Sequence, residues 1–224
     1  MIQAVLFDLD GTLLNRDASV MSFIDDQYDR MHQSLGHIPK EVYAERFIEL
    51  DRRGYVWKDQ VYAQLIQEFN IEQITMENLL EDYIAHFRFH CHPFDGLQAM
   101  LESLKQQGVK LGIISNGKGK FQMDNIKALG IERWFDAILI SESENLRKPD
   151  PRIFERAMAR LNVLPAHSLF VGDHPTTDVE AAKKAGMIGV WKKDAGWSEA
   201  AADYTIDELD ELNRIVQGLN AYID

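Results

Sequence analysis

Short runs of apolar residues recur along the chain and are separated by longer stretches of mixed polarity. The runs are rich in Val, Ile, Leu and Phe and are bounded by polar residues or glycine, which is typical of buried β-strands. The predicted strands cover residues 2–7, 110–114, 137–140, 168–171 and 188–191. A short edge strand is expected at residues 204–206, within an acidic stretch over 203–211 that we interpret as a solvated terminal helix.

Between these strands, apolar residues recur every three or four positions, which is typical of amphipathic helices with one buried face. The predicted helices cover residues 96–107, 121–129, 151–161 and 178–185. Strands that alternate with helices favour parallel pairing, because each helix carries the chain back across the sheet. The predicted fold class is therefore α/β, with a doubly wound, Rossmann-like parallel sheet covered on both faces.

A second helical zone interrupts this alternation directly after the first strand. Its apolar residues also lie three or four positions apart, and no convincing strand pattern is evident in it. The predicted helices cover residues 20–35, 40–53, 58–69 and 76–87. Thr75 is expected to cap the last of them. We therefore predict an α/β core formed by residues 1–17 and 93–224, and an inserted all-helical domain at residues 18–92.

Composition places the chain among soluble globular proteins, with 46% hydrophobic and 27% charged residues. The formal net charge of −12 argues against binding to nucleic acid or to anionic membranes, because both favour basic surfaces. Cys91 is the only cysteine, so a reducing compartment is expected. Neither a signal peptide nor a long apolar segment is evident, and we expect a cytoplasmic protein. Both a monomer and a homodimer are compatible with the sequence.

Polar residues follow several predicted strands, at the edge where open parallel sheets bind their ligands. The acidic residues in these positions are Asp8, Asp10, Asp173 and Asp178. Several carboxylates at one edge would repel one another strongly unless they shared a cation. The sequence therefore predicts a metal ion at this edge of the sheet.

Four motifs resemble the signatures of the haloacid dehalogenase (HAD) superfamily and occur in that family's order. The first is Phe-Asp-Leu-Asp-Gly-Thr-Leu at residues 7–13, and the second is Ser115 with Asn116 after a strand. The third is Lys148 in Arg-Lys-Pro-Asp-Pro, and the fourth is Gly-Asp-His-Pro-Thr-Thr-Asp at residues 172–178. The resemblance covers the predicted core, whereas the insert resembles the family's helical C1-type cap only in position and texture.

The resemblance implies a magnesium-dependent phosphatase that hydrolyses a small phosphomonoester through an aspartyl-phosphate intermediate. Asp8 would be the nucleophile, and its carboxylate is already ionised at neutral pH. Asp10 would protonate the leaving alkoxide and later accept a proton from the attacking water. Lys148 would stabilise charge on the phosphoryl oxygens.

The resemblance also implies two sets of binding residues. Those expected to bind the substrate phosphate are Thr12, Ser115, Asn116 and Lys148. Those expected to bind Mg²⁺ are Asp8, Asp10, Asp173 and Asp178. Asp10 would contribute its backbone carbonyl, and Asp178 is expected to act through a water molecule or to orient another group.

Several alternatives stay open at this point. A phosphomutase uses the same core, and a non-catalytic module that binds phosphorylated metabolites could retain the fold. The segment around Asp8 could be a simple turn, Lys148 a solvated lysine and Asp178 a helix cap. The sequence does not identify the phosphomonoester.

The histidines near residue 90 are a further open question. His86, His90 and His92 lie close together in the sequence beside Cys91, and such donors suit zinc. No second cluster of zinc ligands is evident, so we favour a hinge or a substrate contact for these side chains.

Overall fold

The computed structural model describes residues 1–221, and the chain divides into two compact units. The first unit consists of Met1–Asn15 together with Pro93–Asp224, and the second is Arg16–His92. The chain therefore leaves the first unit after Asn15 and returns to it at Pro93.

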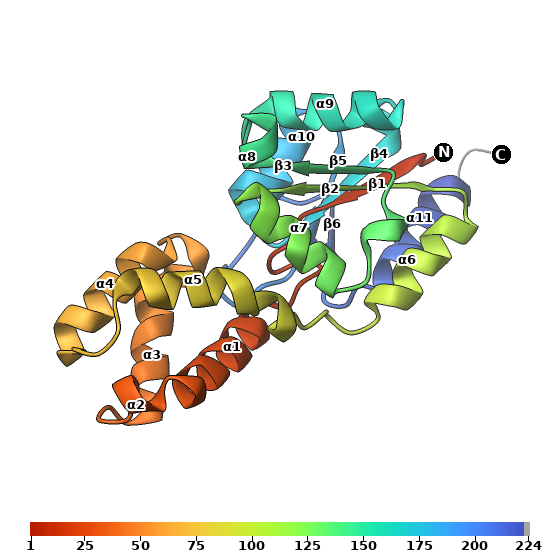
Figure 1. Ribbon diagram of the computed structural model, residues 1–224. Helices are drawn as coiled ribbons and strands as arrows, with labels where there is room; N and C mark the ends of the chain where they lie inside the picture. Colours follow the sequence, from red (N-terminus) through yellow and green to blue (C-terminus); the bar gives the residue numbers. More distant parts are fainter. Residues whose placement is uncertain (222–224) are drawn as a thin grey trace. The chain divides into compact units, whose positions relative to one another are not determined.

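A parallel sheet forms the centre of the first unit (Figure 1). Its strands are β1 (Ala4–Phe7), β2 (Lys110–Ser115), β3 (Ala137–Ile140), β4 (Ser168–Gly172), β5 (Ile188–Lys192) and β6 (Tyr204–Ile206). They lie in the order β3-β2-β1-β4-β5-β6, and every neighbouring pair is parallel. The chain builds the sheet outwards from β1 and then returns to the other side of β1 with β4. This order places the switch point of the sheet between β1 and β4.

Helices cover both faces of this sheet, which confirms the predicted fold class. On one face lie α9 (Pro151–Leu161) and α10 (Ala181–Lys184), and on the other α6 (Leu97–Gln106) and α11 (Glu211–Ala221) (Figure 1). The remaining helical elements are α7 (Gly119–Ala128), α8 (Ser141–Glu144), the 3-10 turns η3 (Glu132–Trp134) and η4 (Pro165–His167), and the π-helical segment η5 (Pro175–Glu180).

The strands are apolar because the helices bury both faces of the sheet. All four residues of β1 are buried, as are all five of β4. Phe170 of β4 packs edge-on against Phe154 of α9, with ring centroids 5.1 Å apart and planes at 74°. Leu6 and Ile114 belong to the same buried cluster. This packing fixes the register of the central strands, and with it the positions of the residues that follow them.

The predicted terminal helix over residues 203–211 is wrong. The acidic stretch forms β6 and a loop, and α11 spans Glu211–Ala221. An amphipathic helix forms where it can bury an apolar stripe. That stripe includes Leu212 and Val216, both fully buried, which lie beyond the predicted range.

All the secondary-structure elements of the second unit, residues 16–92, are helical. Its elements are α1 (Arg16–Arg30), α2 (His32–Leu35), α3 (Lys40–Asp51), η1 (Arg52–Gly54), α4 (Lys58–Phe69), α5 (Met76–His86) and η2 (Phe87–His90). Buried aromatic side chains, among them Phe23, Phe47 and Tyr62, form its core. Thr75 caps α5 as predicted, because its hydroxyl accepts from the backbone N–H of Asn78 while the Asn78 side chain accepts from Thr75.

Two of the clustered histidines contact aspartates within the second unit. His86 Nδ1 lies 2.9 Å from Asp82 Oδ1, and His90 Nε2 lies 3.3 Å from Asp26 Oδ2. The other ring nitrogen of His90 lies 3.0 Å from the hydroxyl of Ser22. The contacts of His90 join η2 to α1, whereas His86 pairs with an aspartate of its own helix, α5.

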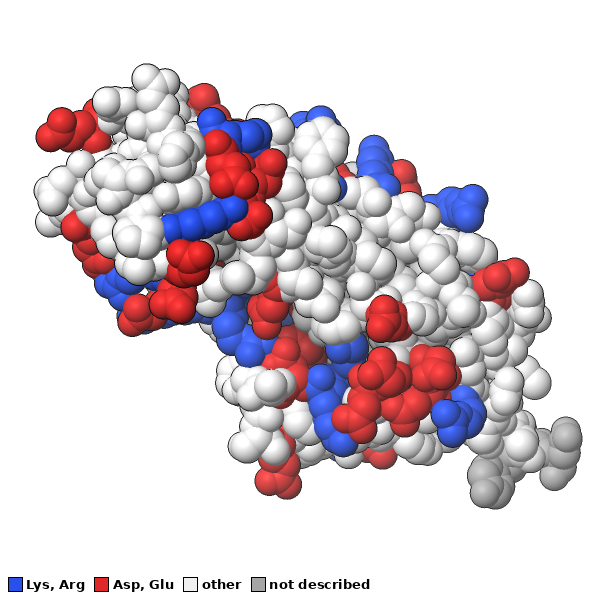
Figure 2. Space-filling view, turned by 90° about the horizontal axis from the view of Figure 1, so that it is seen from below, with Lys and Arg blue, Asp and Glu red and all other residues white. Residues whose placement is uncertain are grey.

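Charged side chains of both signs are mixed over the face shown in Figure 2, where acidic groups lie beside basic ones and no broad basic patch forms. This surface agrees with the acidic net charge of the chain. Within residues 1–221, no helix has both the length and the apolar composition that crossing a bilayer requires.

Replacing Phe154 with Ala should lower the free energy of unfolding by about 3–5 kcal/mol, because a fully buried ring would leave a cavity. Leu164→Ala is the matched control, since that side chain is 63% exposed. Urea denaturation followed by circular dichroism measures both variants. Similar losses in the two variants would contradict the assigned core.

Candidate active site

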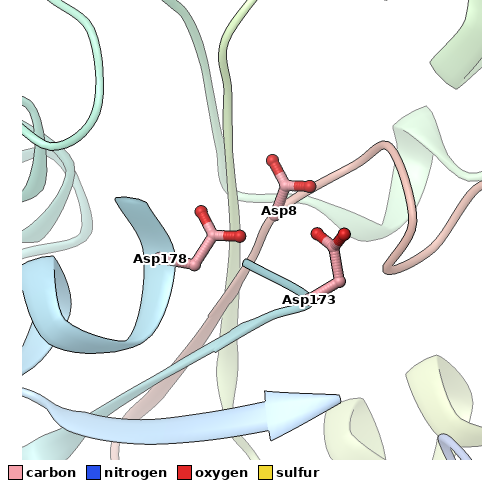
Figure 3. Close-up of side chains that lie close together, drawn as sticks. All are labelled: Asp8, Asp173 and Asp178. Atoms are coloured by element: carbon pink, nitrogen blue, oxygen red, sulfur yellow. The ribbon is translucent and has the colours of Figure 1, made fainter. Parts of the chain in front are cut away.

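Three carboxylates meet at the carboxyl ends of β1 and β4. Asp8 follows β1 and keeps the sheet pairing, with its N–H donating to the Val171 carbonyl at 2.9 Å. Asp173 follows β4, and Asp178 lies in η5. Figure 3 shows their carboxylate groups turned toward one another, and one oxygen from each lies within 4.8 Å of the others. The site therefore lies at the switch point of the sheet, where such folds bind their ligands.

Two glycines allow these carboxylates to approach. Gly11 has φ +83°, and a Cβ added there would lie 2.6 Å from Asp173 Oδ2. A Cβ added at Gly172 would lie 2.4 Å from the Cβ of Asp178. Any larger residue at either position would therefore displace one member of the group.

Lys148 supplies a buried positive charge to this group. Its Nζ donates to Asp8 Oδ1 at 2.5 Å and to Asp178 Oδ1 at 2.6 Å, and the residue is 2% exposed. The side chain of Asn116 forms hydrogen bonds with both the backbone carbonyl and the backbone N–H of Lys148. Its Nδ2 donates to the Lys148 carbonyl at 3.0 Å, and its Oδ1 accepts from the Lys148 N–H at 2.9 Å.

Burial and mutual repulsion shift the acid–base properties of the group. Burial raises the pKa of Asp8 from 3.8 to about 7; Asp178 and Asp10 add to the rise, and Lys148 opposes it. Burial likewise raises the pKa of Asp173 to about 8, with further contributions from Asp8 and Asp178. Burial alone would lower the pKa of Lys148, but the two aspartates that it contacts raise it. A bound divalent cation would favour the ionised carboxylates and so reverse these upward shifts.

The donor set fits a hard divalent cation, because carboxylate oxygens are the ligands that such ions prefer. Asp8 and Asp173 present oxygens toward a common point. Both oxygens of Asp178 already accept hydrogen bonds, one from Lys148 Nζ and the other from the His174 N–H at 3.1 Å. The carboxylate of Asp10 lies outside the group, so a metal role for Asp10 would rest on its backbone carbonyl.

Asp10 and Ser115 are joined by a residue that sequence reasoning missed. Gln122 of α7 donates from Nε2 to Asp10 Oδ2 and to Ser115 Oγ, the latter at 2.8 Å. The sequence carries a partial signal for Gln122, because Gln122 and Asn125 lie at helical spacing with the apolar Ile126. The structure buries all three side chains. Polar residues on the buried face of a helix indicate a polar partner inside.

The hydroxyl of Thr12 is a second indication of a ligand. Thr12 is fully buried, and its Oγ1 has no hydrogen-bond partner among the described residues. A buried hydroxyl without a partner costs free energy, which an anionic ligand could recover. Thr12 lies in the loop that carries Asp8 and Asp10, and Ser115 is the last residue of β2. The Asn116 side chain, by contrast, is hydrogen-bonded to the Lys148 backbone.

The fold and the acidic group place the protein in the class of α/β proteins that carry carboxylates at the switch point of the sheet. A family model described as haloacid dehalogenase-like hydrolase matches residues 5–191. The chain belongs to this family, which confirms the predicted superfamily and the prediction that the protein is an enzyme.

Similar proteins match almost the whole chain. Glyceraldehyde 3-phosphate phosphatase of Pyrococcus furiosus is 34% identical over 98% of this chain and 95% of its own. Pyrophosphatase PpaX of Halalkalibacterium halodurans is 27% identical over 83% of this chain and 81% of its own length. The crystal structure of a HAD phosphatase from Thermococcus onnurineus has 33% identity and a TM-score of 0.69, covering 97% of this chain and 99% of that one.

Gly11→Ala should weaken Mg²⁺ binding by about ten-fold or more, because the added Cβ would push Asp173 out of place. Gly130→Ala is the control: Gly130 also has a positive φ, +69°, but no atom lies within 4 Å of an added Cβ. Both variants carry a backbone cost of about 1–2 kcal/mol. Isothermal titration calorimetry should therefore separate them, and equal Mg²⁺ affinities would contradict the steric argument.

Stabilisation by Mg²⁺ should grow with pH. The folded, metal-free site retains protons on Asp8 and Asp173 up to about pH 7 and 8, whereas the unfolded chain releases them near 3.8. Unfolding free energy without metal should thus fall as pH rises through this window. A divalent cation would bind the deprotonated pair, so the effect of added Mg²⁺ on Tm should be larger at roughly pH 8.5 than at roughly pH 6. Equal shifts at both pH values would contradict this.

Proposed function

We propose that the protein is a magnesium-dependent phosphatase that hydrolyses a small phosphomonoester through an aspartyl-phosphate on Asp8. The observation that carries the proposal is the convergence of buried Asp8 and half-buried Asp173 beside the buried Lys148. A phosphoryl group among carboxylates needs positive charge around it, and this group of residues offers one lysine and the donor set for a divalent cation.

In the first step, a carboxylate oxygen of Asp8 attacks phosphorus. The bond between phosphorus and the ester oxygen breaks, and its electron pair stays on the leaving oxygen. Asp10 gives that oxygen a proton, so the product leaves as a neutral alcohol. The phosphoryl group is now bonded to Asp8.

In the second step, a water molecule attacks phosphorus while Asp10 accepts a proton from it. The bond between phosphorus and Asp8 breaks, which releases inorganic phosphate and restores the carboxylate. Lys148, Ser115 and Thr12 would donate hydrogen bonds to the phosphoryl oxygens through both steps. Mg²⁺, when bound, would neutralise charge on the phosphoryl group and on the carboxylates.

Asp8, Asp173 and the backbone carbonyl of Asp10 would hold Mg²⁺, and Asp178 would orient Lys148. This division is supported by the two hydrogen bonds that the Asp178 oxygens already accept. Asn116 would act on the phosphate through the Lys148 loop that it holds.

We infer that the helical insert, residues 18–92, is a cap domain that selects the substrate, with the catalytic core formed by 1–17 and 93–224. The insert leaves the core directly after the loop that carries Asp8 and Asp10, which supports this role. The names of the relatives suggest which substrates to test first: glyceraldehyde 3-phosphate and pyrophosphate. A cytoplasmic location would suit substrates of this kind.

Asp8→Asn should lower phosphate release by about three orders of magnitude or more, because the amide cannot form the phosphorylated intermediate. The assay supplies Mg²⁺ and a panel of small phosphomonoesters. Asp124→Asn is the control, since that carboxylate pairs with Lys120 on the surface of α7. Acid-quenched wild-type protein should carry phosphate on Asp8 by mass spectrometry. An Asp8→Asn variant as active as the parent would contradict the mechanism, and an isomerised sugar without free phosphate would indicate a mutase.

A further inference from the structure

Gln122 bridges two loops of the site and is almost completely buried. The residue is 3% exposed, and its amide nitrogen donates one hydrogen to Asp10 after β1 and the other to Ser115 at the end of β2. Gly117 leaves room for it, because a Cβ added there would lie 2.7 Å from Gln122 Cγ. The bridge therefore links two segments that are far apart in the sequence.

The orientation of the Gln122 amide follows from its other end. Asn125 Nδ2 donates to Gln122 Oε1 at 3.2 Å, one helical turn further along α7. Asn125 donates to the amide oxygen and the Asp10 carboxylate accepts from the nitrogen, so the nitrogen with its two hydrogens faces Asp10 and Ser115. Each of those two side chains is then restricted to the role of acceptor toward Gln122.

For Ser115 the restriction sets the direction of its hydroxyl hydrogen. The Ser115 oxygen accepts from Gln122, so its own hydrogen is directed elsewhere. For Asp10, the Gln122 amide occupies Oδ2, which leaves Oδ1 to exchange a proton with the leaving group. A carboxyl oxygen that accepts an N–H cannot at the same time direct a proton along that line.

We propose that Gln122 is a positioning residue: it holds the proton donor Asp10 and the hydroxyl of Ser115 in the directions that the reaction uses. The inference rests on the proposed phosphatase function and deepens it. Gln122 itself forms no bond to the substrate. It acts on the first step, in which the P–O bond to the leaving group breaks and Asp10 Oδ1 protonates the departing oxygen.

The test compares two substrates that differ in their need for that proton. An alkyl phosphate such as glycerol phosphate releases a strongly basic alkoxide, whereas 4-nitrophenyl phosphate releases a stable phenolate without protonation. The parameter is kcat/KM, which reports the steps up to departure of the leaving group. Gln122→Met keeps the length of the side chain and removes the two donors. We expect its kcat/KM to fall about ten-fold further on the alkyl phosphate than on 4-nitrophenyl phosphate.

Gln98→Met is the matched control. Gln98 also bridges two partners in the same unit, the Leu129 carbonyl and the Trp134 indole N–H, but lies away from the residues of the site. It should leave the ratio of the two kcat/KM values unchanged. Circular dichroism checks that each variant folds, and Gln122→Glu replaces Gln122→Met if the latter does not, because it keeps the shape and exchanges the donor nitrogen for oxygen.

The outcomes separate the two proposals. Equal losses on both substrates in a folded Gln122 variant would show a merely structural role and overturn the inference while the proposed function stands. Wild-type protein that releases phosphate from neither compound nor from the wider panel would overturn the proposed function, and the role of Gln122 with it.

Discussion

The interaction on which the site depends is the repulsion among Asp8, Asp173 and Asp178, and its partial compensation by Lys148. Parallel strands bring the residues that follow them to a common edge, so the strand order itself forces these carboxylates together. Lys148 pairs with two of them and leaves negative charge in excess. Burial raises the pKa values of Asp8 and Asp173, and the excess negative charge adds to the rise. A divalent cation is the simplest group that would remove that excess.

The surrounding residues hold this unfavourable arrangement in place. Gly11 and Gly172 remove the side chains that would keep the carboxylates apart. Asn116 fixes the Lys148 backbone, and the Trp191 indole N–H donates to the Asp173 carbonyl at 2.7 Å. Repulsive groups remain close only when the rest of the structure over-determines their positions. The buried, fully paired core strands supply that rigidity.

The sequence predicted the parts of the structure that depend on local pattern. The strand at residues 137–140 and the helix at 151–161 match the structure residue for residue, because a compact apolar run bounded by polar residues and a strong amphipathic stripe have few alternatives. The helix predicted over the acidic stretch 203–211 was wrong, because charged residues do not form a helix unless an apolar stripe can be buried. The hydrogen-bond partners of Asn116 and Gln122 could not be identified from the sequence, because they lie 32 and 112 residues away and depend on which segments the sheet brings together.

Gln122 and Asn125 illustrate how such long-range polar contacts leave a local trace. A helix of a doubly wound fold normally buries apolar side chains against the sheet, and burying an amide without partners would cost about 1–3 kcal/mol. α7 buries two amides in neighbouring turns, and one satisfies the other. The remaining donors of Gln122 then have to be satisfied from the loops at the sheet edge. A polar residue in an otherwise apolar stripe is therefore a reason to look for a partner among the residues that follow the strands.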